Sequence, residues 1–459
     1  MAMNRKHFLC LICGILLVSM AAVSLCSCIG QNVGAVEPNT TAAAVTAAPQ
    51  TEKVSVNSSK YIAQGLKDKN VTDPHQAMGR NPNIEHLEEL YSDLGVASGD
   101  MHHHTWYSDG YRTFAEVKKS ADKYRYDFFA CSEHNNWKQV DDELWNGKRN
   151  LYSMEYTTSK GHMNIYFPEK ESLAKMGDFE YYDETRGLNY HMAFDKIPDV
   201  PVVDPRYWGQ GYMQTYTKSL KDGTTFYRQL VDYVHDLGGF IQLCHPFIPN
   251  YLFSPVDDND TGNIEYFGFD AVEIFNGTTF NHTGLIEYNV RAYEYWQYLL
   301  DLGEKVYATT GSDTHYLFEG ESITHMNVEQ KSAEGYYNAL AAGNFSLSNR
   351  IDGAKILMSI GDTMMGGTAE YQPGETLCVC IDFKRGYGAY RVNIYTDRGI
   401  AYSQVYSDRH VEIEFPIQDR DYYRVEIVKA TGKITSTTDK QKYPYYLAFS
   451  QPIFLSAAD

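Results

Sequence analysis

The chain has 459 residues, which exceeds one ordinary domain, so we expect two folded units with tails. Its formal net charge of −19 argues against a long nucleic acid as the partner, because binding to phosphates needs a basic track. We interpret the excess of acidic residues as the ordinary solubility of an enzyme rather than as recognition of a basic partner. The oligomeric state stays open at this level.

Residues 1–28 have the features of a signal peptide with a lipobox. A basic segment precedes an apolar run from residue 8 to residue 23, and the Leu-Cys-Ser-Cys sequence that follows ends at Cys28. Cys28 has Leu three residues before it and the small residue Ser directly before it, whereas Cys26 has the bulky Leu25 directly before it. Cys28 is therefore the residue expected to carry a lipid.

A plain signal peptide and an uncleaved anchor are the alternatives, although the apolar run is short for a stable membrane span. We predict an exported protein, either a cell-surface lipoprotein anchored at Cys28 or a secreted one. Its only membrane contact would be this N-terminal lipid or signal anchor. Residues 29–58 are rich in Ala, Thr, Val and Pro, which cannot build a core, and are predicted to be a flexible tether.

The segment 100–105 holds three consecutive histidines after an aspartate. Side chains alternate along an extended segment, so His102 and His104 point to one face and can bind one ion, while His103 points away. Imidazole nitrogen and carboxylate oxygen are suitable ligands for borderline divalent cations. A fortuitous surface run of histidines is the less favoured alternative, because matching His and carboxylate residues follow later in the chain.

Several of these later residues come directly after short apolar runs. Such runs are typical of buried parallel strands, and functional residues at the carboxyl ends of strands are typical of an α/β barrel. The runs and the residues after them are 126–131 before Glu133 and His134, 240–244 before His245, and 306–310 before Asp313 and His315.

Helical periodicity lies between these runs, and glycine ends most of the periodic segments. One helix is expected to place Phe114, Val117, Ala121 and Tyr124 on its apolar face, and the others are expected at 224–236, 285–301 and 333–342. A long insertion at 169–223 includes the aromatic segment 208–212. Loops of this length are usually functional or disordered, so a lid over the site and simple surface packing both stay open.

The ordered motifs between residues 95 and 350 resemble the polymerase-and-histidinol-phosphatase (PHP) metallohydrolase superfamily. The segments 155–164, 272–277 and 311–315 are more similar to its carbaryl-hydrolase-like branch. The resemblance implies an α/β fold, a distorted (β/α)7 PHP-type barrel over residues 59–350, with up to three metal ions.

The resemblance also implies the ligands. The expected sets are His102, His104, Glu155 and Asp313 for the first ion, Glu155, His162 and His245 for the second, and Asp109, His134 and His315 for the third. Glu155 would bridge two ions, and Glu155, Asp313 and His245 are the expected catalytic residues. Two or three divalent ions of Zn, Mn or Fe suit such ligands. Glu133 departs from the family pattern, which has Asp at this position, so the resemblance does not settle how His134 is oriented.

Other residues with metal-binding or anion-binding chemistry have no partner motif. An ordinary surface or core role is expected for His75, His86, His191, His235, His282, His325 and His410. Lys138, Arg206 and Arg228 are candidate anion clamps, with a solvated surface charge as the favoured interpretation of each. Cys131 and Cys244 are expected to be buried, Cys378 and Cys380 to share one strand face, and no disulfide framework is indicated.

The character of the chain changes after residue 351. The runs 390–395, 411–415 and 423–428 alternate with period two and are separated by turns rich in Gly and Asp. We predict a small antiparallel β-sandwich over residues 351–459, in which no catalytic chemistry is evident.

These residues predict a metal-dependent hydrolase. Bound ions would lower the pKa of a water molecule, which then attacks the substrate. A small phosphate ester suits this chemistry best, because phosphoryl transfer depends on positioning and charge stabilisation. A carbamate or aryl ester is the alternative, as is a surface binding protein without turnover. The chain has no Gly-rich phosphate loop and no Gly-x-Ser-x-Gly motif, which argues against nucleotide-dependent transfer and serine hydrolysis.

Overall fold

The computed structural model describes residues 82–157, 161–183, 188–191, 223–248 and 266–456, all of which belong to one compact unit. The predicted signal peptide, Cys28, the tether, His75, Arg206 and the aromatic segment 208–212 lie outside these residues. Within them, no helix is both long enough and apolar enough to cross a membrane.

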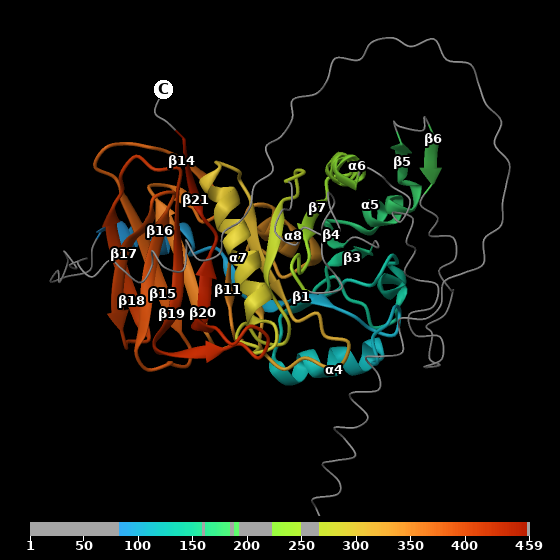
Figure 1. Cartoon of the computed structure of the whole chain (residues 1–459), viewed down its shortest axis with the longest axis horizontal. Helices are drawn as coiled ribbons and strands as arrows, with labels where there is room; N and C mark the ends of the chain where they lie inside the picture. The colour runs from blue at the N-terminus through green and yellow to red at the C-terminus, as the bar shows by residue number, and fades with distance from the viewer. Residues whose placement is uncertain (1–81, 158–160, 184–187, 192–222, 249–265, 457–459) are drawn as a thin grey trace, which may run out of the picture. The chain divides into compact units, whose positions relative to one another are not determined.

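The strands around the candidate site form a curled half-barrel (Figure 1). One part is β1, which pairs in parallel with β2 and antiparallel with β10; the other is a sheet of order β3-β4-β7-β8-β9. The bounds are β1 Gly95–His103, β2 Phe128–Cys131, β3 Tyr152–Thr157, β4 His162–Phe167, β7 Phe240–Leu243, β8 Ala271–Asn276, β9 Tyr307–Gly311, β10 Ile323–Val328 and β11 Phe345–Ser348.

The predicted parallel pairing is confirmed for β1 with β2 and for β7, β8 and β9. Strands β3 and β4 pair antiparallel, as do β4 and β7, which the apolar runs did not indicate. The described strands thus form a mixed α/β fold with a curled half-barrel sheet and a separate antiparallel sheet. The closed seven-stranded barrel stays a prediction.

The predicted helices are confirmed to within about two residues at each end, which is the usual scatter of helix boundaries. On α4, Phe114, Val117 and Ala121 are buried as expected, and Thr113 and Glu116 form a reciprocal capping box at its start. The helices are α3 Pro82–Leu90, α4 Phe114–Tyr124, α5 Lys170–Ala174, α6 Gly223–Asp236, α7 Ile286–Asp301 and α8 Ala333–Ala341, with short 3-10 turns at Lys138–Asp141 and Lys175–Asp178.

The C-terminal strands form two facing layers, coloured orange to red in Figure 1. The antiparallel sheet β13-β12-β15-β18 faces β16, β17, β19 and β20 across a shared apolar core. The bounds are β12 Ala354–Ile360, β13 Thr363–Met364, β14 Thr368–Glu370, β15 Thr376–Phe383, β16 Tyr390–Thr396, β17 Gly399–Tyr406, β18 His410–Pro416, β19 Tyr422–Thr435, β20 Lys442–Ser450 and β21 Ile453–Ser456; a hairpin of β5 Glu180–Asp183 and β6 Leu188–His191 stands apart.

One layer of these C-terminal strands continues into the half-barrel. Strand β20 pairs with β11, which pairs with β10, which in turn pairs with β1. The strand that carries His102 is therefore hydrogen-bonded through two neighbours to the C-terminal layer. The domain boundary at residue 350 stays a prediction, since the hydrogen bonding of this sheet continues on both sides of it.

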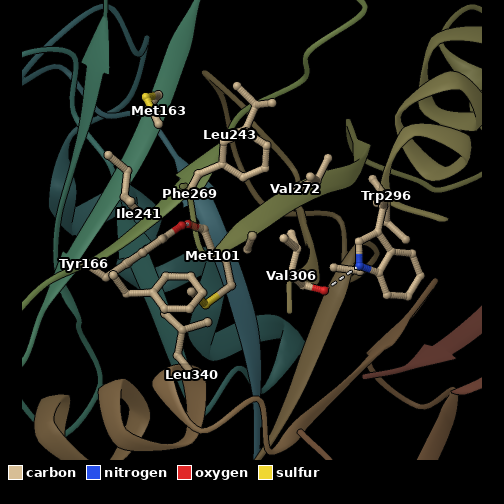
Figure 2. Packing of buried hydrophobic residues seen from close by; sticks show 14 of the residues in the cluster. Met101, Met163, Tyr166, Ile241, Leu243, Phe269, Val272, Trp296, Val306 and Leu340 are labelled. Atoms are coloured by element: carbon tan, nitrogen blue, oxygen red, sulfur yellow. Dashed lines mark hydrogen bonds between the residues drawn. The ribbon is translucent and has the colours of Figure 1, made fainter. Parts of the chain in front are cut away.

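A continuous apolar core lies inside the half-barrel (Figure 2). Met101, Tyr166 and Leu243 are fully buried in it, and the Trp296 ring Nε1–H donates to the Val306 carbonyl at 2.8 Å. Burying a large apolar side chain stabilises a fold by about 1.5–3 kcal/mol. The strands whose ends carry the candidate ligands are therefore anchored by this core.

Helix α7 connects this core to the C-terminal layer. Its Asn289 side chain exchanges two hydrogen bonds with the backbone of Asn276 at the end of β8, at 3.2 and 2.9 Å. On β19 the fully buried Arg424 donates to the Tyr293 hydroxyl of α7 at 2.8 Å and to Gln297 Oε1 at 2.9 Å. A buried guanidinium is costly unless it is hydrogen-bonded, so these contacts fix how α7 packs on β19.

The four cysteines in the described residues are free thiols, and all are buried. Cys378 and Cys380 share one face of β15, as predicted, where Ile84 and Leu87 of α3 cover them. This packing accounts for the burial of both thiols.

Candidate metal centre

The end of β1 presents His102 and His104 to one side and His103 to the other, as side-chain alternation predicts. Asp100 Oδ1 accepts hydrogen bonds from the backbone N–H groups of His102, at 2.9 Å, and of Ser312, at 3.1 Å. This carboxylate therefore joins the end of β1 to the loop after β9. His103 packs instead on Phe318, with 4.4 Å between the ring centroids.

The first predicted ligand set comes together as a compact tetrad. His102 Nε2 and His104 Nε2 lie 3.3 Å apart. Glu155 Oε2 lies 3.5 Å from the first of these nitrogens and 3.1 Å from the second, and Asp313 Oδ1 lies 3.5 and 3.2 Å from them. Ligands at about 2.0–2.1 Å from a tetrahedral ion are roughly 3.3 Å apart, so these spacings suit one small divalent ion.

Glu155 also reaches the second predicted set. Its Oε1 lies 2.9 Å from His162 Nδ1 and 3.4 Å from His245 Nε2. The two oxygens of this carboxylate thus face different histidines, as a carboxylate that bridges two ions requires. Glu155 Oε2 is buried among three imidazole nitrogens at 3.0 to 3.5 Å, a position that a metal ion would satisfy.

The third predicted set lies on the other side of His104. Asp109 Oδ1 is 3.1 Å from His315 Nε2, and Asp109 Oδ2 is 3.5 Å from His134 Nε2. The His104 ring stacks on the rings of both His134 and His315, at centroid distances of 4.4 and 4.5 Å. His134 also connects the sets, because its Nδ1 lies 3.0 Å from Glu155 Oε2 and 2.5 Å from Thr157 Oγ1.

Several of the nine side chains strongly perturb one another. Burial alone would raise the pKa of Glu155, but the charges of His134, His162 and His102 outweigh it and hold this pKa well below its ordinary value. Burial would lower the pKa of His315, yet Asp109 raises it to about 9. Burial prevails at His162, where it lowers the pKa to about 4. Such opposed shifts are typical of functional sites.

Two residues beyond the predicted ligands organise the cluster. Glu273 Oε1 lies 3.0 Å from His102 Nδ1, while its Oε2 accepts from the His245 backbone N–H and from Asn276 Nδ2, each at 3.0 Å. Asn276 Nδ2 also donates to Asp313 Oδ2 at 3.1 Å. Neither residue is among the site residues predicted from the sequence. A carboxylate within the apolar run of β8 was the available signal, because a fully buried charge needs partners.

Glu133 holds the loop after β1 and does not contact His134 through its carboxylate. Its oxygens accept from the Thr105 backbone N–H at 3.0 Å and from the hydroxyls of Thr105 and Ser108, each at 2.5 Å. Burial raises the pKa of this carboxyl group. The longer side chain at this position therefore orients the segment that leads to Asp109.

The backbone is strained at two of the predicted ligand positions. His245 and Asp313 have positive φ angles of 29° and 47°, which are uncommon for residues with a side chain. At Gly110 a Cβ atom would lie 2.5 Å from the His104 carbonyl oxygen, so only glycine fits the turn beside Asp109. Such strain concentrates where side-chain direction matters more than local stability.

The cluster opens to solvent along one edge. The side chains of Asp109, Asp313 and His315 are 26%, 21% and 29% exposed, whereas those of His102 and Glu155 are 0% and 1% exposed. A substrate can therefore approach the Asp109 and His315 side, while the ligands on the opposite side are shielded from water.

The remaining candidates lie elsewhere or in ordinary environments. Arg228 is exposed on α6 and donates to the Tyr266 carbonyl at 3.3 Å, and Lys138 begins a 3-10 turn. Among the other histidines, His86, His235 and His410 pair with exposed or partly exposed carboxylates, and the buried His325 bonds to Ser98 Oγ at 2.7 Å. Cys131 and Cys244 are buried as predicted, and Cys244 lies close to His102 and Glu273.

No family model matches the chain, and no curated protein matches it. Among solved structures, it is similar to a two-domain protein from Bacteroides vulgatus that contains a predicted PHP-like metal-dependent phosphoesterase. The identity is 13% and the TM-score is 0.35, and the match covers 81% of this chain and 99% of that chain. A lesion-specific endonuclease from Pyrococcus furiosus matches with 13% identity, 55% and 58% coverage and a TM-score of 0.34.

A third structure is an amidohydrolase from Chromobacterium violaceum with bound sulfate and no metal, with 17% identity, 48% and 87% coverage and a TM-score of 0.28. Identities and TM-scores this low carry no argument about activity. The geometry of the cluster is therefore the basis for a function.

This geometry fits a multinuclear metal centre. The described residues include several overlapping groups of close His, Asp and Glu side chains, among them His104 with Asp109, His134 and His315, and Glu155 with His134 and His162. The donors are imidazole and carboxylate, and they converge at one point of the half-barrel. Individual ligand assignments stay predictions, and so do the identity and number of the ions.

Proposed function

We propose that the chain is a metal-dependent hydrolase, a phosphoesterase that acts on a small phosphate ester. The position of Glu155 carries this proposal, because its two buried oxygens lie within 3.5 Å of five histidines. A carboxylate in this position suits two adjacent ions. An anionic ester is stabilised by several positive centres more than a neutral ester is, which places phosphate esters ahead of carbamates.

Divalent ions held by the cluster would lower the pKa of a water molecule and polarise the ester oxygen. The residues of the chain supply binding, orientation and exclusion of water. Glu273 fixes the ring of His102, and Asn276 fixes Asp313, so both ligands are presented in one orientation. The exposed edge at Asp109 and His315 admits the ester. On this proposal the described strands β1 to β4 and β7 to β11 belong to the distorted seven-stranded PHP barrel that is expected over residues 59–350.

Two alternatives remain in competition with this proposal. One is hydrolysis of carbamates or aryl esters, which the resemblance of segments 155–164 and 272–277 to the carbaryl-hydrolase-like branch favours. The other is a surface binding protein without turnover. The complete set of nine ligand-type side chains in one cluster favours an enzyme, because a site without activity has no reason to keep such costly buried charges together.

The proposal predicts release of phosphate from generic aryl phosphates by the purified chain loaded with Zn, Mn or Fe. A chelator should stop the reaction, and metal added back should restore it. Carbamate cleavage without phosphate release would reverse the order of the two substrate classes. A protein with a full metal complement that turns over neither class would be a binding protein.

We also propose that the chain is exported and anchored by a lipid on Cys28. The support is the basic segment, the short apolar run and the lipobox-like sequence that ends at Cys28. A Cys28→Ser variant should leave the membrane fraction and appear in the soluble exported fraction, as measured by fractionation and immunoblotting. If the variant stays in the membrane like the parent, an uncleaved helix anchors the protein.

A further inference from the structure

Two exposed tyrosines stack on each other beside the open edge of the cluster. The rings of Tyr111 and Tyr316 have centroids 4.7 Å apart and are inclined by only 9°. The residues are 41% and 54% exposed, so the stacked pair presents much of its surface to solvent. Parallel rings at this distance are a favourable aromatic arrangement that can accept a further ring on an open face.

The pair belongs to the same two loops as the exposed ligands. Tyr111 follows Asp109 by two residues, and Tyr316 directly follows His315. The Tyr111 backbone N–H donates to the His315 carbonyl at 2.7 Å, which joins the two loops. The turn at Gly110 is tight against His104, so the loop that carries Tyr111 has a defined path. Both rings are therefore held at the edge where a substrate would enter.

Exposed apolar side chains are concentrated at this edge. Seven large hydrophobic residues are exposed in the described part of the chain, and three of them, Tyr111, Tyr316 and Leu317, lie within two residues of Asp109 or His315. Single exposed apolar residues need no explanation, but a group beside a polar site marks a binding surface. The chain thus combines a charged cluster with an adjoining aromatic surface.

We propose that the stacked pair of Tyr111 and Tyr316 is a platform for a planar aromatic group of the ester, which stacks on Tyr316 while the ester itself lies at the cluster. This inference rests on the proposed function and narrows it to esters with an aromatic substituent next to the reacting group. An alkyl ester has no flat face to stack and loses this contact.

Binding of two phosphonates to the full-length, metal-loaded chain tests the platform without any need for turnover. Phenylphosphonate should bind roughly three- to tenfold more tightly than methylphosphonate, as measured by isothermal titration calorimetry. Tyr316→Ala should remove this preference, and Tyr316→Phe should keep it because the ring remains. Tyr182→Ala is the matched control, since Tyr182 is 46% exposed on β5, a strand that carries none of the predicted ligands.

Equal affinity for the two phosphonates, failure of both to bind, or a phenyl preference that survives Tyr316→Ala would overturn the platform. A phenyl preference that depends on Tyr316 supports it even if the same sample releases no phosphate from aryl phosphates, in which case only the proposed function fails. Conversely, phosphate release with no Tyr316-dependent preference would keep the proposed function and remove the platform.

Discussion

Replacing Glu155 by alanine should abolish turnover and strip metal from the chain. The Glu155 carboxylate lies within 3.5 Å of His102, His104, His134, His162 and His245, so its removal takes a ligand from two neighbouring ion positions at once. We expect kcat/KM to fall by roughly 10²- to 10³-fold or more. Elemental analysis of the dialysed variant should show fewer ions per chain than the parent.

Glu294→Ala is the matched control for this variant. Glu294 on α7 is also fully buried, and in the described part of the chain its carboxylate has no hydrogen-bond partner. Burial raises the pKa of Glu294 to about 8, so its removal takes away no essential charge. The control should keep the metal content and activity of the parent. Parental metal content and activity in Glu155→Ala would remove Glu155 from the site.

Changing Glu273 to glutamine should weaken metal binding although Glu273 is not among the predicted ligands. Its carboxylate contacts His102 Nδ1 at 3.0 Å and holds the backbone N–H of His245 at 3.0 Å. Glutamine keeps the size of the side chain but loses the charge that orients the imidazole. Loss of such a partner typically costs about 10- to 100-fold in metal affinity or activity.

Competition with a chromophoric chelator measures the affinity of Glu273→Gln for metal, and Glu294→Gln serves as the matched control. The melting temperature of the metal-free variant separates the effect from misfolding, because a merely structural role would lower it without a specific loss of affinity. An affinity equal to that of the parent would show that His102 needs no partner at Nδ1.

Local sequence patterns were sufficient to predict the helices and to predict that the ligand-type side chains lie close together. Periodic apolar residues ended by glycine predicted α6, α7 and α8. A helix on a protein core buries one stripe of apolar side chains, and it ends readily at glycine, which adopts the left-handed conformation without steric strain. Ligand-type residues after apolar runs predicted a common site, because parallel strands end at the same edge. His102 and His104 lie on one face because side chains alternate along an extended strand.

Features that depend on long-range pairing were not predictable in this way. The pairing of β11 with β20 joins residues far apart in the sequence, and no local pattern encodes it. The antiparallel pairing of β3 and β4 was foreseeable, since strands so close in the chain cannot be joined by a parallel crossover. The stacked tyrosines were not predictable, because only the folded chain brings them together. For Glu273 the carboxylate within an apolar run was a signal, but its partners become evident only in the fold.

The most direct test of the account is a metal titration of the metal-stripped chain, with bound metal and phosphate release followed in the same samples. The account predicts that two or three ions bind per chain and that release from an aryl phosphate begins only after more than one has bound. Hydrolysis at full rate with one ion, or no retained ion in a folded chain, would contradict a multinuclear centre built around Glu155.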